Sequence, residues 1–206
     1  AHLERIFPKY KYKMINHKHK FVFIHIPKTA GTSIESLFIN NAHIKDVPGK
    51  HNMVSDIGSE FLKKYFTFTF VRNPWDRMVS YYNFRLKRSF DMYNHGDSFK
   101  EWIRFLCSDE VQNIKAYQFN LAIKSQYEFL VSKSNEISVD FIGRFENFQE
   151  DFNTICDKIG MPQQKLPHKN ATNHKHYTEY YDDESREIVA EKYAKDIEYF
   201  NYEFGE

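Results

Sequence analysis

The residue types that could do chemistry are concentrated in Phe21-Val-Phe-Ile-His-Ile-Pro-Lys-Thr-Ala-Gly-Thr-Ser33. A run of apolar and β-branched residues ends at a proline. A lysine, a small flexible turn and two hydroxyl residues follow, and apolar residues then return at helical spacing with Ile34, Leu37 and Phe38. This pattern predicts a strand, a tight loop containing a cation, and a helix. Backbone N–H groups at a helix N-terminus have no partners within the helix and lie at the positive end of its dipole. Such a loop binds anions, and phosphate above all.

The loop differs from the phosphate-binding loop of nucleotide kinases and NTPases. That motif is Gly-x-x-x-x-Gly-Lys-Ser/Thr, whereas here the lysine precedes the glycine by three residues and the first glycine is missing. No strand ends in a clear magnesium-binding aspartate, so the loop is not built for Mg·ATP hydrolysis. Lys28 can instead reach a bridging oxygen of the ligand and neutralise the charge that develops there as the bond breaks.

A second candidate element is Arg72-Asn-Pro-Trp-Asp-Arg-Met-Val-Ser80. Arg72 follows a predicted strand, and Ser80 lies two helical turns into the next predicted helix. An arginine fork and a hydroxyl placed this way can hold a second, separate phosphate. A nucleoside with anionic groups at both ends would satisfy both elements.

The elements that must position these residues alternate between strand and helix. Apolar patterns and capping signals predict strands at 21–26, 66–71 and 139–143, a shorter strand at 127–131, and helices at 31–41, 74–87, 147–159 and 183–200. The fold class is therefore α/β: a P-loop-like, three-layer fold with a mainly parallel central sheet flanked by helices. In such sheets ligands bind beyond the carboxyl ends of the strands, where both Lys28 and Arg72 lie. We expect a basic N-terminal arm of irregular structure over residues 1–20 and one domain over 21–206.

Composition excludes some classes of protein. Lys plus Arg (29) nearly balances Asp plus Glu (28) in 206 residues, which argues against a general nucleic-acid or membrane-surface binder. No apolar run is long enough for a transmembrane helix, and no signal peptide is visible at the start. Cys107 and Cys156 are interpreted as buried free thiols, with a disulfide between them left open.

Together the two elements resemble the sulfotransferases. Ile26-Pro-Lys-Thr-Ala-Gly-Thr-Ser33 looks like their 5′-phosphosulfate loop, and Phe70-Val-Arg-Asn-Pro-Trp-Asp-Arg-Met-Val-Ser-Tyr-Tyr82 looks like their 3′-phosphate motif. The stretches 140–148, 177–182 and 196–200 fit the carbohydrate sulfotransferase branch, so the resemblance extends over about residues 21–204.

The resemblance implies 3′-phosphoadenosine 5′-phosphosulfate (PAPS) as donor, adenosine 3′,5′-bisphosphate (PAP) as product, and no metal. It places Lys28 against the leaving oxygen, and Arg72 and Ser80 against the 3′-phosphate. The 5′ end would be bound by the rest of the loop: Thr29, Ala30, Gly31, Thr32 and Ser33. Arg144, after the strand at 139–143, either reaches the cofactor or acceptor or forms a structural salt bridge.

The acceptor hydroxyl needs a general base. Relatives often carry a histidine in a Gly-His segment between the two motifs, and here Pro48-Gly-Lys-His-Asn-Met-Val54 makes His51 the candidate. An unperturbed histidine pKa near 6.5 suits this role. His25 is the rival, although within a strand it is more typical of a hydrogen-bonded core residue.

The sequence thus predicts a PAPS-dependent sulfotransferase acting on a hydroxyl, with a carbohydrate as the favoured acceptor and no nucleic acid as partner. A nucleotide-dependent, kinase-like phosphotransferase and a non-catalytic nucleotide-binding module are the alternatives. The expected compartment is the cytoplasm for a bacterial chain, or the Golgi lumen if a membrane anchor has been trimmed from a eukaryotic one. No oligomeric state is predicted.

Overall fold

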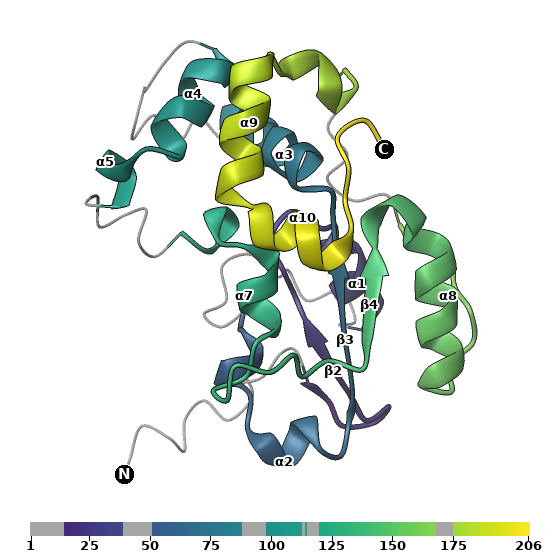
Figure 1. Cartoon of the computed structure of the whole chain (residues 1–206). Helices are drawn as coiled ribbons and strands as arrows, with labels where there is room; N and C mark the ends of the chain where they lie inside the picture. The colour runs from purple at the N-terminus through teal and green to yellow at the C-terminus, as the bar shows by residue number, and fades with distance from the viewer. Residues whose placement is uncertain (1–14, 39–50, 88–97, 113, 115–119, 168–174) are drawn as a thin grey trace. The chain divides into compact units, whose positions relative to one another are not determined.

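The computed structural model describes residues 15–38, 51–87, 98–112, 114, 120–167 and 175–206 (Figure 1). The chain divides into two compact units. The first combines residues 1–71 with 128–169 and contains the sheet; the second combines 72–127 with 170–206 and, in its described part, is helical. The single domain expected over residues 21–206 stays a prediction.

The sheet of the first unit has four strands in the order β1-β2-β3-β4. They are β1 (Ile15–Asn16), β2 (Phe21–Ile24), β3 (Phe66–Val71) and β4 (Phe141–Arg144). β1 pairs antiparallel with β2, whereas β2–β3 and β3–β4 are parallel. The mainly parallel sheet predicted from the alternation of strands and helices is confirmed.

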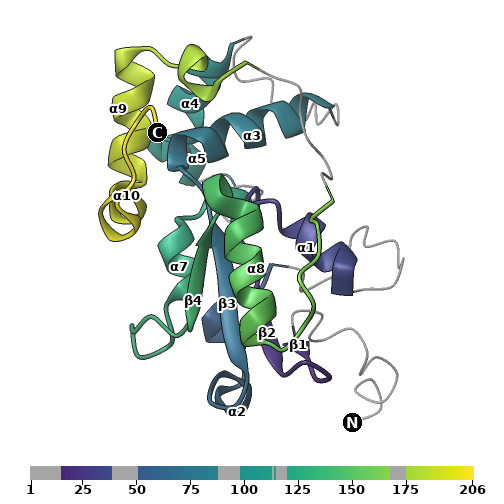
Figure 2. The same ribbon diagram turned by 90° about the vertical axis from the view of Figure 1, so that its right-hand side faces the viewer.

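Phenylalanines at alternating positions make one face of this sheet apolar. Two helices pack on that face, α1 (Gly31–Phe38) and α8 (Phe148–Lys158), as Figure 2 shows. The buried residues of this core are Phe21, Phe23, Ile34, Phe68, Phe70, Phe152, Ile155, Cys156 and Leu166. β4 requires glycine at position 143, because a Cβ there would lie 2.6 Å from the Phe70 ring.

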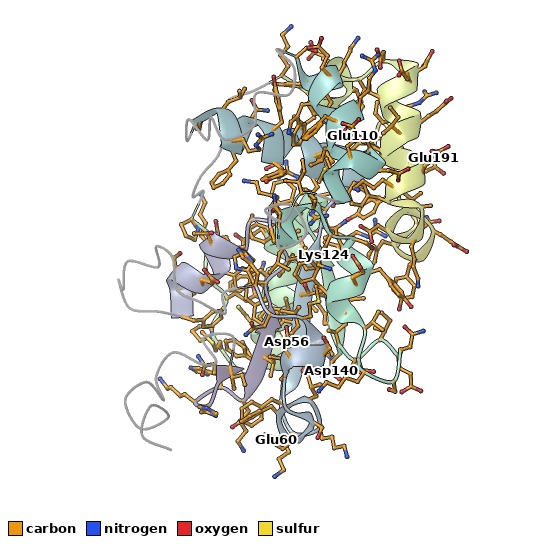
Figure 3. The ribbon with its side chains drawn as sticks, turned by 90° about the vertical axis from the view of Figure 1, so that its left-hand side faces the viewer. Asp56, Glu60, Glu110, Lys124, Asp140 and Glu191 are labelled. Atoms are coloured by element: carbon orange, nitrogen blue, oxygen red, sulfur yellow. The ribbon has the colours of Figure 1, made fainter. Side chains whose placement is uncertain are left out.

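Short elements complete the first unit. They are η1 (Val54–Asp56), α2 (Ser59–Leu62), η4 (Phe145–Asn147) and the end of α7 (Gln126–Leu130), which begins in the second unit. Asp140 (labelled in Figure 3) ties the start of β4 to β3. Its N–H donates to the Thr67 carbonyl at 2.7 Å, and its carboxylate accepts from the Thr67 N–H at 2.7 Å.

The second unit is built from α3 (Pro74–Lys87), α4 (Phe99–Leu106), α5 (Asp109–Gln112), η3 (Leu121–Ile123), η5 (Tyr177–Tyr180), α9 (Asp183–Lys192) and α10 (Ala194–Phe200). α3, α4 and α9 lie side by side around an aromatic core (Figure 1). The helix predicted over 74–87 is confirmed, and side chains cap the starts of both α3 and α4. The Asn73 carboxamide oxygen accepts from the Trp75 N–H, and Ser98 forms a reciprocal capping box with Glu101.

Three expectations about the elements were wrong. Residues 127–131 were expected as a strand, but 126–130 form helix α7, whose first amides are capped by a distant carboxylate described below. The helix expected over 183–200 breaks at Tyr193, where ψ is 24° and the ring is buried. Part of the arm expected to be irregular forms β1, whose Ile15 is buried because it pairs with Val22.

Cys107 and Cys156 are both free cysteines, as predicted; Cys156 is buried, whereas Cys107 is half-buried. Burial raises the pKa of Cys107 to about 11. Among the helices that the structure describes, none combines the length and hydrophobicity needed to cross a membrane.

Candidate active site

The loop between β2 and α1 has an unusual backbone. Lys28 and Ala30 both adopt left-handed conformations, with φ of 71° and 62°. Each costs a non-glycine residue about 1–2 kcal/mol, so the surrounding structure must hold the loop in place. The Ser33 N–H donates to the Ala30 carbonyl at 2.9 Å, and the Thr29 hydroxyl donates to the Ile26 carbonyl at 2.9 Å.

These contacts separate the roles of the loop side chains. Thr29 is fully buried and its hydroxyl braces the loop from within, so its backbone N–H is the group left to serve a ligand. Gly31 and Ser33 are also buried, whereas Lys28 and Thr32 are half-buried. The structure therefore places Lys28 in the turn that leads directly into the first amides of α1, and the binding of an anion there stays a prediction.

A buried, hydrogen-bonded pair of side chains stabilises the loop from the side of the sheet. His25 Nδ1 lies 2.7 Å from Oε1 of Glu35 in α1, and both side chains are nearly inaccessible to solvent. The His25 ring lies against Gly31, where an added Cβ would come within 2.2 Å of the ring. Gly31 is thus required by packing, and the pair links the end of β2 to the first turns of α1.

His51 packs against His25, the strand-end residue of this pair. Its Nδ1 lies 3.0 Å from the backbone carbonyl oxygen of His25. The two imidazole rings pack edge to face, with their centroids 4.4 Å apart. A carbonyl oxygen only accepts hydrogen bonds, so Nδ1 of His51 carries the proton. In the neutral ring the lone pair is then on Nε2, which is the form of histidine that acts as a base through Nε2. Residues 48–50 of the Gly-His segment lie outside the described residues.

In the second unit Arg72 is the residue that directly follows β3. It is 8% exposed, and its Nε donates to Oδ2 of Asp76 at 2.7 Å. Asp76 and Ser80 are four residues apart in α3 and therefore share one face of the helix. The ion pair therefore anchors the Arg72 guanidinium to the helix face that also carries Ser80. Joint binding of a phosphate by Arg72 and Ser80 stays a prediction.

Two other arginines have different surroundings. Arg77 is fully buried and donates to the carbonyls of Lys124 (2.9 Å) and Ala122 (3.1 Å), so it stabilises the fold and is closed to a ligand. Arg144 ends β4, is half-buried, and its N–H donates to Asp151 at 2.6 Å. Its role toward cofactor or acceptor stays a prediction.

Sequence reasoning missed four residues that support the site: Glu35, Asp76, Gln126 and Asp196. Asp76 had a readable signal, since it stands four positions after Arg72. Gln126 contacts Arg72 across 54 positions, and no local pattern indicates such a contact. Within the described ranges no group of three or more His, Cys, Asp or Glu side chains is arranged to hold a metal ion.

Comparison with known proteins decides the family. A family model described as "Sulfotransferase family" matches residues 12–203. The chain belongs to the sulfotransferase family. The resemblance carried by the two motifs is therefore confirmed, and the phosphate-type loop between β2 and α1 belongs to a sulfotransferase.

Several relatives are similar to this sulfotransferase. Carbohydrate sulfotransferase 11 of Mus musculus is 23% identical, with 93% of this chain and 67% of that protein aligned. Carbohydrate sulfotransferase 14 of Danio rerio is also 23% identical, over 73% of this chain and only about half (48%) of its own length. An uncharacterized protein of Archaeoglobus fulgidus is 29% identical over 52% of this chain and 78% of that protein.

Proposed function

We propose that this sulfotransferase transfers the sulfuryl group of PAPS to a hydroxyl group of a carbohydrate. The observation that carries the proposal is the β2–α1 loop, where Lys28 and the first amides of α1 are held at one turn by a strained backbone. The names of the relatives, two of which are carbohydrate sulfotransferases, support the choice of acceptor.

Donor binding follows from the strand ends. β2 and β3 are parallel neighbours, so their carboxyl ends reach the same edge of the sheet. The loop after β2 would bind the 5′-phosphosulfate through the amides of residues 29–32 and the Lys28 ammonium group. Arg72 and Ser80 would bind the 3′-phosphate, because a guanidinium fixed at Nε by Asp76 presents its remaining donors in a rigid fork.

The transfer step uses two side chains of the first unit. His51 accepts the proton of the acceptor hydroxyl at Nε2, and the acceptor oxygen forms a bond to sulfur. The bond between sulfur and the bridging oxygen of the 5′-phosphate breaks, and PAP leaves with the electron pair. Lys28 and the amides of α1 stabilise the negative charge that develops on the leaving phosphate. His51 is held in the required tautomer by the His25 carbonyl, and this is general base catalysis in its usual form.

Ligand-dependent thermal stability separates this function from its alternatives. We expect PAP without metal to raise the Tm of the full chain, because a ligand that binds only the folded state stabilises it. A rise with Mg·ATP and none with PAP would favour a phosphotransferase instead. Transfer of labelled sulfuryl groups from PAPS to a panel of glycans and small alcohols then tests turnover. PAP binding without any transfer would indicate a non-catalytic binding module.

The base is tested by His51→Ala with His17→Ala as the matched control. His17 is an exposed histidine that contacts Tyr65, at the opposite end of β2 from the loop. We expect His51→Ala to lower turnover by about 10²-fold or more while PAP still raises the Tm, since general base catalysis contributes about 10²–10⁴-fold. The His17 variant should keep normal turnover. Equal turnover in the two variants would contradict the role of His51.

A further inference from the structure

The backbone of Arg72 is held by one buried side chain. Gln126, the first residue of α7, is fully buried, and its carboxamide forms two hydrogen bonds with this single residue. The Arg72 N–H donates to Oε1 at 2.9 Å, and Nε2 donates to the Arg72 carbonyl oxygen at 2.8 Å. The amide of Gln126 thus pairs with both backbone groups of Arg72, as an adjacent strand would.

Gln126 is in turn held by Asp196 of α10. The Asp196 carboxylate is fully buried and accepts three hydrogen bonds from consecutive residues: the Ser125 hydroxyl, the Gln126 N–H at 2.8 Å and the Tyr127 N–H at 2.9 Å. The two amides belong to the first turn of α7, which has no partners within its own helix for them. Asp196 therefore acts as a cap supplied from 70 positions away and fixes where α7 begins.

The segment before Gln126 is clamped through its carbonyl groups. Arg77 of α3 donates to the carbonyls of residues 122 and 124, and the Tyr193 hydroxyl donates to the Ile123 carbonyl at 2.9 Å. Burial raises the pKa of Tyr193, so this hydroxyl stays protonated and continues to donate. Lys124, labelled in Figure 3, belongs to this clamped segment. The carbonyls of residues 122–124 and the amides of residues 126 and 127 are thus fixed by side chains of other elements.

We infer that Gln126 and Asp196 are positioning residues that set the place of the Arg72 guanidinium and thereby the selectivity for the 3′-phosphate; this rests on the proposed function. Arg72 lies between β3 and α3, outside the bounds of both elements. A bidentate contact to phosphate requires a guanidinium held to within a fraction of an ångström. The amide of Gln126 supplies that constraint at the backbone, and Asp76 supplies it at the side chain.

The test measures selectivity. The dissociation constants of PAP and of adenosine 5′-phosphate, which lacks the 3′-phosphate, are determined for the full chain and its variants. The selectivity ratio is the dissociation constant of adenosine 5′-phosphate divided by that of PAP. It reports the contact with the 3′-phosphate and does not change when part of the protein is unfolded. Gln126→Met removes both hydrogen bonds at similar volume. Gln149→Met is the matched control, because Gln149 likewise bonds two backbone groups, the Gln164 carbonyl and the Leu166 N–H, in the first unit.

We expect Arg72→Ala to reduce the ratio by about 10-fold or more, as the loss of a hydrogen-bonded charge does. Gln126→Met should reduce it by about 3–10-fold, Asp196→Asn should act in the same direction, and Gln149→Met should leave it unchanged. In the Arg72→Ala background, Gln126→Met should cause no further reduction, because both changes act on one contact.

Each outcome is informative. If the unaltered chain does not distinguish PAP from adenosine 5′-phosphate, the proposed 3′-phosphate contact fails and the positioning role fails with it. If Arg72→Ala lowers the ratio and Gln126→Met leaves it at the level of the unaltered chain, the positioning role alone is overturned. Should Asp196→Asn not fold, the Gln126 variant still decides between these results.

Discussion

A single methyl group added at Gly31 tests how the β2–α1 loop is stabilised. A Cβ at this position would lie 2.2 Å from Cδ2 and 2.4 Å from Nε2 of His25, so the ring would have to move by about 1 Å to reach ordinary contact at 3.4 Å. The ring is 3% exposed and bonded to Glu35 at 2.7 Å. A shift of that size breaks this bond or displaces the first turn of α1.

The expected loss in the free energy of unfolding of Gly31→Ala follows from three effects. Loss of a hydrogen bond to a charged group costs about 1.5–3 kcal/mol, and overpacking a buried site costs about 1–3 kcal/mol. Alanine is favoured over glycine in a helix by about 1 kcal/mol, which opposes them. We therefore expect Gly31→Ala to lower the free energy of unfolding by about 2–5 kcal/mol. At about 2–4 °C per kcal/mol for a chain of this size, the Tm should fall by roughly 5–15 °C.

Urea denaturation of Gly31→Ala, His25→Ala and the double variant is the assay. Removing the imidazole removes the clash, so the double variant should be more stable than the sum of the single effects by at least about 1 kcal/mol. Gly160→Ala is the control: nothing lies within 4 Å of its Cβ, and its φ of +67° predicts only a backbone cost of about 1–2 kcal/mol. A Gly31→Ala protein as stable as the original, or strictly additive single effects, would refute the reasoning.

Three further predictions concern the loop and the thiols. Lys28→Ala should lower turnover by about 10²-fold or more, whereas Lys20→Ala, at the other end of β2, should leave it unchanged in the same sulfuryl-transfer assay. Ala30→Gly should raise the Tm by up to about 2–4 °C, because glycine accepts a φ of 62° without strain. A lower Tm would show that the backbone of Ala30 is not strained. Cys107 keeps its proton in the folded state up to its pKa of about 11, while an unfolded thiol loses it near pH 9. Stability should therefore fall between pH 9 and 11, and urea midpoints should show a weaker fall in Cys107→Ala.

Several elements of both units could be predicted from the sequence because their determinants are local. The strand at Phe66–Val71, the helix at Pro74–Lys87 and the end of α8 at Gly160 (φ +67°) were all predicted from periodicity, proline and glycine. The loop itself was readable because its lysine, glycine and hydroxyl residues stand together. The buried pairing of His25 with Glu35 was not, since an isolated glutamate in a helix is usually exposed.

The errors have a common physical cause. Tyr127 and Phe129 alternate as in a strand, yet α7 forms there because Asp196 caps its first amides from another part of the chain. The helix expected over 183–200 breaks because Tyr193 is pulled into the core, where its hydroxyl bonds the Ile123 carbonyl. In both places a contact between residues about 70 positions apart overrode a local preference, and local patterns contain no information about such contacts.

The two parts of the proposed donor site are therefore stabilised in different ways, and substitutions should affect them differently. The loop after β2 depends on the left-handed conformations of Lys28 and Ala30 and on the buried pairing of His25 with Glu35, so changes there should act first on folding stability. Arg72 depends on side chains contributed by Gln126, Asp76 and, through α7, Asp196. Changes at those positions should leave the loop intact and weaken discrimination between nucleotides. A set of variants that separates stability from selectivity along this division would support the assignment of the 5′ end to one element and the 3′-phosphate to the other.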